Sequence, residues 1–260
     1  MAVFCDFENV ALGVRDARYD RFDIQRVLER LLLKGPIIVK KAYCDWGRYS
    51  EFKAAMHEAA FELIDIPHVR QSGKNSADIR MVVDALDLCY TKSHVRSFVL
   101  ITGDSDFSPL VSKLRENDKE AIGVGVKNST SDLLIANCDE FIYYDDLVRE
   151  QVAQNAQKKA AKKTAKKTTK ETPKNDDDRK QEAIDLVLDT IEALFAERGA
   201  EEKIWGSMVK QTLKRQRPGF NETYYGFRSF SRLLEDAAAR GLIEVEEDER
   251  SGGVIIRGFK

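Results

Sequence analysis

The sequence lacks any long hydrophobic run. In 260 residues, no apolar stretch approaches the roughly 20 residues that a membrane-spanning helix needs, so we expect no membrane partner. Residues 1–10 carry no basic region before their apolar run, and Asp6 interrupts that run too early for a signal peptide. We therefore expect the chain to stay in the cytosol.

Cysteine and histidine are scarce. The four cysteines form no CxxC pair, and each lies in or beside an apolar segment, which predicts buried, reduced thiols. The three histidines show no spacing typical of zinc ligands, so we interpret them as structural or surface residues. These residues are Cys5, Cys44, Cys89, Cys138, His57, His68 and His94.

An excess of one charge is also absent. The net charge is -2, and the 43% of hydrophobic residues is ordinary for a soluble globular protein. The balance hides local asymmetry, because residues 158–170 (KKAAKKTAKKTTK) are strongly basic and residues 244–250 (EVEEDER) are acidic. Local fields therefore matter more than the total charge.

What the first 148 residues do contain is a regular alternation of apolar runs and helical patterns. It predicts an α/β fold with a central parallel sheet flanked by helices, whose strands bind ligands at their carboxyl ends. The expected strands are 2–7, 36–45, 61–67, 97–102, 120–126 and 140–145. The expected helices are 20–35, 48–60, 76–90, 105–118 and 129–138.

The composition changes after this part. Residues 149–180 are rich in Lys and Ala and have almost no large apolar side chain, which predicts a flexible linker. Residues 181–260 show three helical patterns and a β-hairpin. This order predicts a small winged-helix-like α+β domain, a shape common in nucleic-acid binding.

Carboxylates gather where the predicted strands end. Asp6 ends the first strand, Asp104 and Asp106 follow the strand at 97–102, and Asp78 opens a helix. Because the first and fourth strands of such sheets are often neighbours, we expect these acids to lie close together. Like charges that close repel unless a cation lies among them, and all-oxygen ligands select Mg²⁺ or Mn²⁺. Such a site orients phosphate esters and activates water.

Each acid also has a purely structural interpretation. Asp78, Asp104 and Asp106 would stabilise the N-termini of the helices that follow them. Asp6 interrupts an apolar strand, where we expect no helix-capping role to be available. Asp6 therefore favours the shared site.

Three stretches resemble the signature motifs of NYN domains, a family of the PIN-like nuclease group. They are CDFENV (5–10), SGKNSADIRMVVDAL (72–86) and LITGDSDFSPLVSKLRENDKEAIGVGV (100–126). The resemblance covers residues 1 to about 148. It implies a PIN-like fold and the metal-dependent hydrolysis of RNA phosphodiesters.

The resemblance also assigns residues. The divalent metal of the family would be bound by Asp6, Asp78 and Asp104. Asn9 matches the Asn that shapes the pocket, and Asp106 is the usual fourth acid. A further matching acid, Asp84, comes six residues after Asp78, which leaves its place in the site open. Candidates for holding water or substrate phosphate are Asn9, Lys74, Asn75, Thr102 and Ser105, although a plain loop is the alternative for Lys74 and Asn75.

Residues 179–259 resemble the LOTUS, or OST-HTH, domain, chiefly through WGSMVKQTLKRQRPGFNETYYGFRSFSRLLEDA. That family is associated with RNA binding. We expect Lys214, Arg215 and Arg217 to contact RNA. The aromatic residues Tyr225 and Phe227, with Phe230, are better explained as core.

Three hypotheses follow. The first is a Mg²⁺- or Mn²⁺-dependent ribonuclease acting on single-stranded or structured RNA, with a C-terminal RNA-binding module. The second is a catalytically weak or inactive RNA-binding or regulatory protein; the intact acids and Asn9 favour the first. A haloacid-dehalogenase-like phosphatase would need a second Asp where this chain has Glu8. The sequence leaves open which RNA is cut, whether DNA is cut, endo- or exonucleolytic action, and whether the protein is a homo-oligomer.

Overall fold

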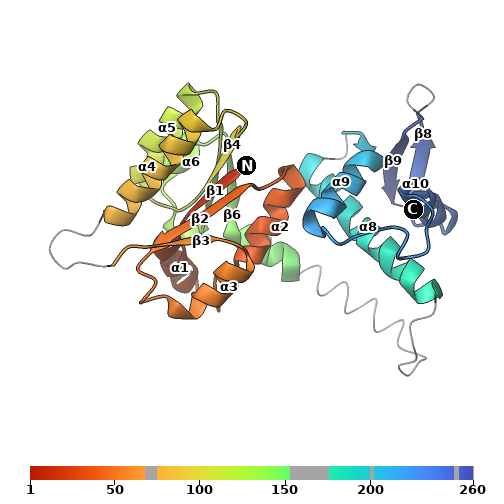
Figure 1. The fold of residues 1–260 in the computed structure, drawn as a ribbon, viewed down its shortest axis with the longest axis horizontal. Coiled ribbons are helices and arrows are strands. Elements are labelled where there is room, and N and C mark those ends of the chain that lie inside the picture. Colours follow the sequence, from red (N-terminus) through yellow and green to blue (C-terminus); the bar gives the residue numbers. More distant parts are fainter. Residues whose placement is uncertain (68–74, 153–175, 200–201, 249–251, 260) are drawn as a thin grey trace. The chain divides into compact units, whose positions relative to one another are not determined.

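A computed structural model describes residues 1–67, 75–152, 176–199, 202–248 and 252–259. These residues fall into two compact units. The N-terminal unit carries a six-stranded parallel sheet, and the C-terminal unit carries a three-stranded antiparallel sheet (Figure 1).

The central sheet has the strand order β3-β2-β1-β4-β5-β6. Every neighbouring pair in it is parallel, which confirms the predicted fold class. Each strand lies within the range expected from the sequence. The strands are β1 (Ala2–Asp6), β2 (Val39–Cys44), β3 (Glu62–Asp65), β4 (Ser97–Ile101), β5 (Glu120–Gly125) and β6 (Glu140–Tyr143).

Helices cover both faces of this sheet (Figure 1). One face packs against α1 (Phe7–Asp16), α2 (Ile24–Lys34), α3 (Lys53–Glu58) and a helix at 144–152. The other face packs against α4 (Ser76–Thr91), α5 (Ser108–Glu116) and α6 (Asp132–Asn137). Short 3-10 turns are η1 (Ser50–Phe52), η2 (Ser105–Phe107) and η3 (Lys127–Ser129).

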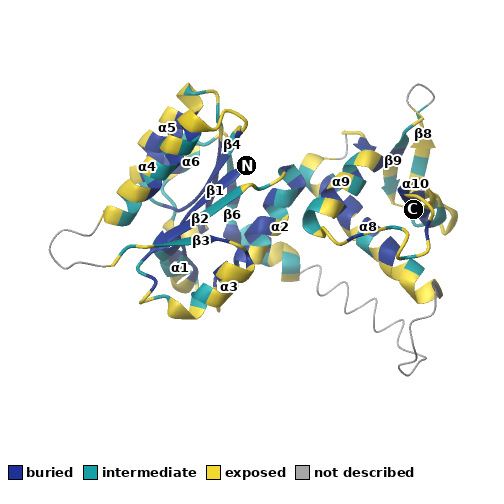
Figure 2. Cartoon of the chain, in the orientation of Figure 1, coloured by how far each residue is buried: buried dark blue, intermediate teal, exposed yellow. Residues whose placement is uncertain are grey.

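Strand β1 lies at the centre of the N-terminal unit and is buried along its whole length (Figure 2). Val3 and Cys5 belong to the core on the α1 side, whereas Ala2 and Phe4 belong to the core on the α4 side. This alternation is the period of two that a strand imposes on its side chains. The buried strand fixes the position of Asp6, its last residue.

Helix α1 was not predicted, and it corrects one expectation about Asp6. Phe7, Val10 and Val14 follow at helical spacing and are buried. Asp6 is the N-cap of this helix, because its Oδ1 accepts a hydrogen bond of 3.4 Å from the backbone N–H of Asn9. The expectation that no helix-capping role is available to Asp6 is therefore wrong. Strand and helix join without a loop, so the sequence shows no break between them.

The C-terminal unit contains the three helices and the hairpin expected. They are α8 (Asp176–Arg198), α9 (Gly206–Gln216), α10 (Phe230–Ala239), β8 (Ile243–Glu247) and β9 (Val254–Phe259). A short strand, β7 (Ile204–Trp205), pairs with β9 and was not predicted. Helix α8 begins inside the expected linker 149–180, and residues 149–152 are also helical. Residues 153–175 lie outside the described part of the chain.

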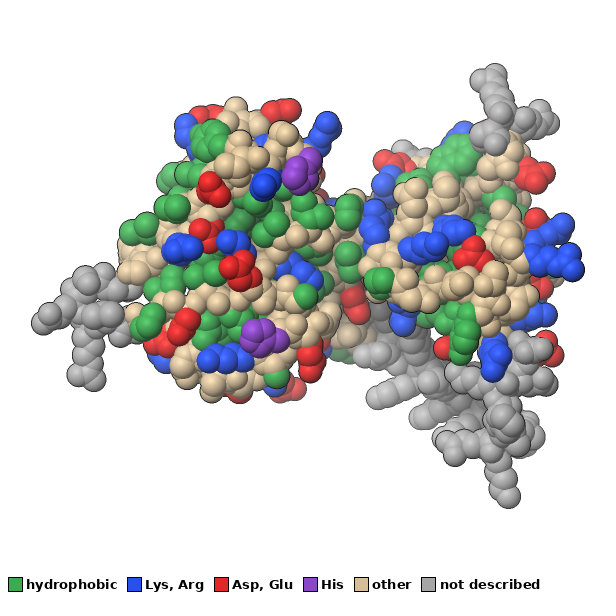
Figure 3. All heavy atoms as spheres, viewed as in Figure 1, with side chains coloured by type: hydrophobic (Ala, Val, Ile, Leu, Met, Phe, Trp, Pro, Cys, Tyr) green, Lys and Arg blue, Asp and Glu red, His purple; other side chains and the backbone are tan. Residues whose placement is uncertain are grey.

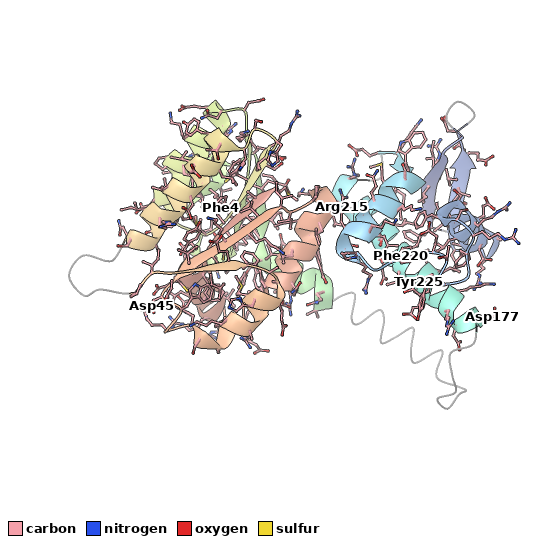
Figure 4. All side chains as sticks on the ribbon, in the orientation of Figure 1. Phe4, Asp45, Asp177, Arg215, Phe220 and Tyr225 are labelled. Carbon is pink, nitrogen blue, oxygen red and sulfur yellow. The ribbon has the colours of Figure 1, made fainter. Side chains whose placement is uncertain are left out.

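The aromatic residues of this unit mostly build its core. Phe227 and Phe230 are buried, as expected, and Tyr225 is partly buried. The ring of Tyr225 stacks on that of Phe220, with centroids 5.5 Å apart and the planes 24° from parallel (Figure 4). Tyr224 is exposed and remains available for contacts.

The cysteine prediction is confirmed for the thiols, all of which are free. Cys5, Cys44 and Cys89 are buried, and Cys138 is half-buried. Within the described ranges, no helix is both long enough and apolar enough to cross a membrane.

Candidate active site

The candidate site lies between β1 and β4, the two strands at which the strand order of the sheet changes direction. From β1 the chain builds β2 and β3 on one side, and from β4 it builds β5 and β6 on the other. Parallel sheets of this kind open a crevice at that point, at the carboxyl ends of the strands. Asp6 ends β1, and Gly103 and Asp104 follow the end of the neighbouring strand β4.

A buried hydroxyl joins these two strand ends. The Oγ1 of Thr102 donates to Oδ2 of Asp6 at 3.0 Å and accepts from the backbone N–H of Asp104 at 3.2 Å. Thr102 has no exposed surface. It therefore positions Asp6 and Asp104, and this role replaces the contact with phosphate or water that the sequence suggested for Thr102.

Asn9 and Gly103 fix the turn after β4. The Oδ1 of Asn9 accepts from the backbone N–H of Gly103 at 2.7 Å, and the carbonyl of Gly103 accepts from the N–H of Ser131 at 2.9 Å. A Cβ at Gly103 would overlap the carbonyl oxygen of Ser129 and lie 3.0 Å from Cα of Thr130. Glycine is therefore required by the close approach of another backbone segment.

Asp104 and Asp106 take part in starting a helix as well. Asp104 is the N-cap of η2, and its Oδ1 accepts from the backbone N–H of Asp106 at 2.9 Å. Asp106 is exposed in the first turn, and Pro109 then opens α5. Capping uses only one oxygen of Asp104, so its structural interpretation is compatible with the site interpretation.

The charges of the acids act on one another. Asp6 is only 8% exposed, and burial raises its pKa to about 7, with the charges of Asp78 and Asp104 adding to the rise. The hydrogen bonds from Thr102 and Asn9 oppose it. The pKa of Asp78 is also raised, first by burial and then by the charges of neighbouring acids, Asp104 and Asp106 among them. Asp78 and Asp104 therefore lie near enough for their charges to act on Asp6, as do Asp104 and Asp106 for Asp78.

An open groove of about 710 Å³ lies between α4 and α5, and two of the four acids, Asp78 and Asp106, line it. Its lining residues are Asn75, Asp78, Ile79, Val82, Val83, Ser105, Asp106, Phe107, Ser108, Pro109, Ser112 and Leu133. Asn75 and Ser105, both proposed from the sequence as substrate contacts, lie on this groove. Lys74 falls outside the described residues.

The donor set of the site has the chemistry of a hard-cation site. Carboxylate oxygens are the ligands that Mg²⁺ and Mn²⁺ prefer. Within the part of the chain that the structure describes, however, no three His, Cys, Asp or Glu side chains already surround a common point at which they would hold an ion. The acids fit a divalent metal by type and mutual charge, and their side chains would have to close around it.

Comparison with known proteins decides the family. A family model described as the NYN domain matches residues 1–147. The chain belongs to the NYN domain family. NYN domains are PIN-like nuclease domains, so the N-terminal unit has a nuclease fold. The match ends before the C-terminal unit, and the LOTUS resemblance of that unit stays a prediction.

A crystal structure of a protein of unknown function from Vibrio parahaemolyticus is similar to part of this chain. The two sequences are 26% identical, and the TM-score is 0.50. The alignment covers 56% of this chain and 93% of that one. A search of curated proteins found no match.

Two further charged residues, Glu8 and Arg48, lie near the candidate site and were not expected there from the sequence. The charge of Glu8 contributes to the raised pKa of Asp78, after burial and the charges of Asp104 and Asp106. The Nη1 of Arg48 donates to Oε1 of Glu8 at 3.0 Å. Glu8 lies in the CDFENV motif, which was a signal for it. Arg48 follows β2, at the start of the helix expected at 48–60, and nothing in the sequence pointed to it as a site residue.

Asp84 lies in a separate network of the NYN domain. Its carboxylate accepts from the hydroxyl of Tyr43 at 2.9 Å, from Nζ of Lys41 at 3.2 Å and from Nε of Arg80 at 3.1 Å. Burial alone would raise the pKa of Asp84, but the hydrogen bonds from Tyr43 and Lys41 and the nearby cations lower it. Asp84 thus links α4 to β2 and does not belong to the group formed by Asp6, Asp78, Asp104 and Asp106.

The basic residues proposed to contact RNA lie at the end of α9. Lys214 and Arg217 are exposed. The Nη2 of Arg215 donates to Oγ1 of Thr212, one turn earlier on the same helix, at 2.7 Å. Of the three, Lys214 and Arg217 thus offer the more accessible cations.

Proposed function

We propose that this protein is a ribonuclease that hydrolyses RNA phosphodiesters with Mg²⁺ or Mn²⁺ held by Asp6, Asp78 and Asp104. The observation that carries the proposal is the Thr102 hydroxyl, which ties Asp6 to the backbone of Asp104 in the crevice between β1 and β4. Asp78, from α4, lies near enough for its charge to act on Asp6. Such an arrangement of acids from three segments suits a cation that contacts a phosphate.

Each residue has a distinct task in this mechanism. A divalent cation held by Asp6, Asp78 and Asp104 would supply positive charge that polarises a phosphate and makes a bound water more acidic. Hydrogen bonds from Thr102 and from the backbone of Asn9 orient the carboxylate of Asp6, which would hold the ion together with Asp78 and Asp104. Asp106 is exposed on the groove, and we assign its carboxylate oxygens the role of accepting the proton of the attacking water.

The C-terminal unit supports an additional role in RNA binding. Lys214, Arg215 and Arg217 place cations at the end of α9, which would contact phosphates. The exposed ring of Tyr224 lies 5.7 Å from the guanidinium carbon of Arg179, and exposed aromatic rings stack on unpaired bases. We propose that this unit holds RNA while the NYN domain cuts it.

The test is cleavage of a mixed RNA pool by the full chain with and without Mn²⁺ or Mg²⁺. We expect cleavage only with the metal, and none with Asp104→Asn, which should keep its fold and most of its RNA affinity. Asp87→Asn is the matched control, since Asp87 is exposed on α4 and does not line the groove. Undiminished cleavage by Asp104→Asn, or in excess chelator, would overturn the proposal.

An RNA-binding protein without catalysis is the second candidate. It is favoured by one observation: no group of acids in the described ranges stands ready-made around a metal position. The same assay separates the two functions. RNA binding without cleavage, at Mn²⁺ concentrations that saturate ordinary metal nucleases, would favour the second.

A further inference from the structure

The groove beside the acids has an apolar wall that is open to solvent. Ile79 and Val83 on α4 are 63% and 55% exposed, and Leu133 on α6 is 58% exposed. Hydrophobic side chains gather at the surface over α4 (Figure 3). Other apolar residues of the same helix, Met81 and Ala85, are buried in the core, so α4 carries a second apolar side that the fold does not use. Large apolar side chains grouped at a surface mark binding sites.

We propose that this groove binds a base of unpaired RNA next to the phosphate that the acids act on. The inference rests on the proposed function and names the form of its substrate. The groove has the size of sites for small ligands, which run from about 300 to 1,000 Å³. It is therefore large enough for one nucleotide.

The order of residues along the groove matches the parts of a nucleotide. Asp78 and Asp106 lie at the starts of their helical segments, and Ile79 and Pro109 follow within one turn, a rise of about 5.4 Å. The aliphatic wall would therefore be within reach of the base of a nucleotide whose phosphate lies at Asp78 and Asp106. Asn75 also lines the groove, and its side chain makes no capping hydrogen bond to α4. Its amide would contact polar atoms of the nucleotide.

A second copy of the chain fits this groove less well. A two-fold interface places the same patch on both subunits, so it would bring two sets of Asp78 and Asp106 together. Like charges brought together at such an interface would repel one another. An RNA bound with a divalent cation brings the charge that the acids need.

The test is a double-mutant cycle on RNA cleavage by the full chain, in which a change in the protein is combined with a change in the RNA. One change is the double variant Ile79→Ala with Val83→Ala, which keeps good helix formers on α4. The other change is an abasic nucleotide beside the cut site of an unpaired RNA. We expect each change alone to lower kcat/KM about tenfold, and both together to lower it little further, because they remove the same contact. Tyr90→Ala, exposed on the same helix but outside the groove, should change nothing.

The other outcomes are distinct. Additive losses, or a double variant that behaves like Tyr90→Ala, would overturn the inference while leaving the nuclease assignment intact. No cleavage by the wild-type chain would overturn both. If the double variant turns a wild-type dimer into a monomer in solution, the groove is a subunit interface and the inference is wrong.

Discussion

Replacing Asp6 by Asn should stabilise the metal-free protein above neutral pH and abolish its cleavage of RNA. Burial and neighbouring acids raise the pKa of Asp6 from 3.8 to about 7, which corresponds to about 4 kcal/mol of destabilisation once the carboxylate is charged. Asn is neutral and of the same shape, but it has one oxygen where Asp6 uses two acceptors. Losing one hydrogen bond costs about 1 kcal/mol, so we expect a net gain of about 3 kcal/mol at pH 8.

The sign of the pH dependence follows from the direction of the shift. The pKa of Asp6 is higher in the folded than in the unfolded chain, so the folded state binds the proton more tightly. The contribution of Asp6 to the free energy of unfolding is therefore largest below about pH 4 and is lost as the pH rises to about 7. Asp6→Asn lacks this dependence. At pH 5 the two proteins should differ by less than about 1 kcal/mol.

The two tryptophans allow the NYN domain to be observed alone. Trp46 is buried, and its ring centroid lies 5.0 Å from that of Phe7, next to Asp6. Trp205 belongs to the C-terminal unit, so a Trp205→Phe background leaves the fluorescence of Trp46 as the reporter. Urea unfolding with chelator present, at pH 5 and pH 8, gives the free energies. If Asp6→Asn is less stable than its parent at pH 8, or differs equally at both pH values, the electrostatic reasoning fails.

Three further predictions use the same assays. Thr102→Val should lower the free energy of unfolding by about 1–3 kcal/mol and slow RNA cleavage, because it leaves buried polar atoms unpaired. Thr102→Ser keeps the hydroxyl and should behave like the wild type. Equal behaviour of the two variants would contradict the positioning role. Gly103→Ala should lower the free energy of unfolding in urea by about 1–3 kcal/mol, because the added Cβ overlaps the backbone of Ser129. A change below about 0.5 kcal/mol would show that the backbone at Ser129 moves to accommodate the Cβ. Mn²⁺ at 100 times its Kd should stabilise the wild type at pH 8 by about 2.7 kcal/mol and Asp6→Asn hardly at all; equal stabilisation would place the ion elsewhere.

The sheet could be predicted because its signals are local. Each strand is a short apolar run closed by polar residues or a turn, and the order of strands and helices indicates parallel pairing. Helix α1 could not be recognised because Phe7 and Val10 continue the apolar run of β1. Strand β7 has only two residues, and pairing with the distant β9 alone defines it.

The residues of the candidate site can be divided in the same way, into those marked by local sequence signals and those defined by contacts between distant parts of the chain. The four acids could be proposed from the sequence because strand ends, a helix start and motif spacing mark them. The role of Thr102 could not, since it depends on contacts to Asp6 and Asp104 across two strands. Asp84 remained open because six residues on a helix turn it away from Asp78, and its partners Lys41 and Tyr43 come from another part of the chain.

Binding of Mn²⁺ to the full chain, followed through the electron paramagnetic resonance of the free ion, tests most directly whether separated aspartates act as one site. We expect a single tight site per chain that is lost in Asp6→Asn, Asp78→Asn and Asp104→Asn and kept in Asp87→Asn. Unchanged Mn²⁺ binding by the three single variants would contradict it.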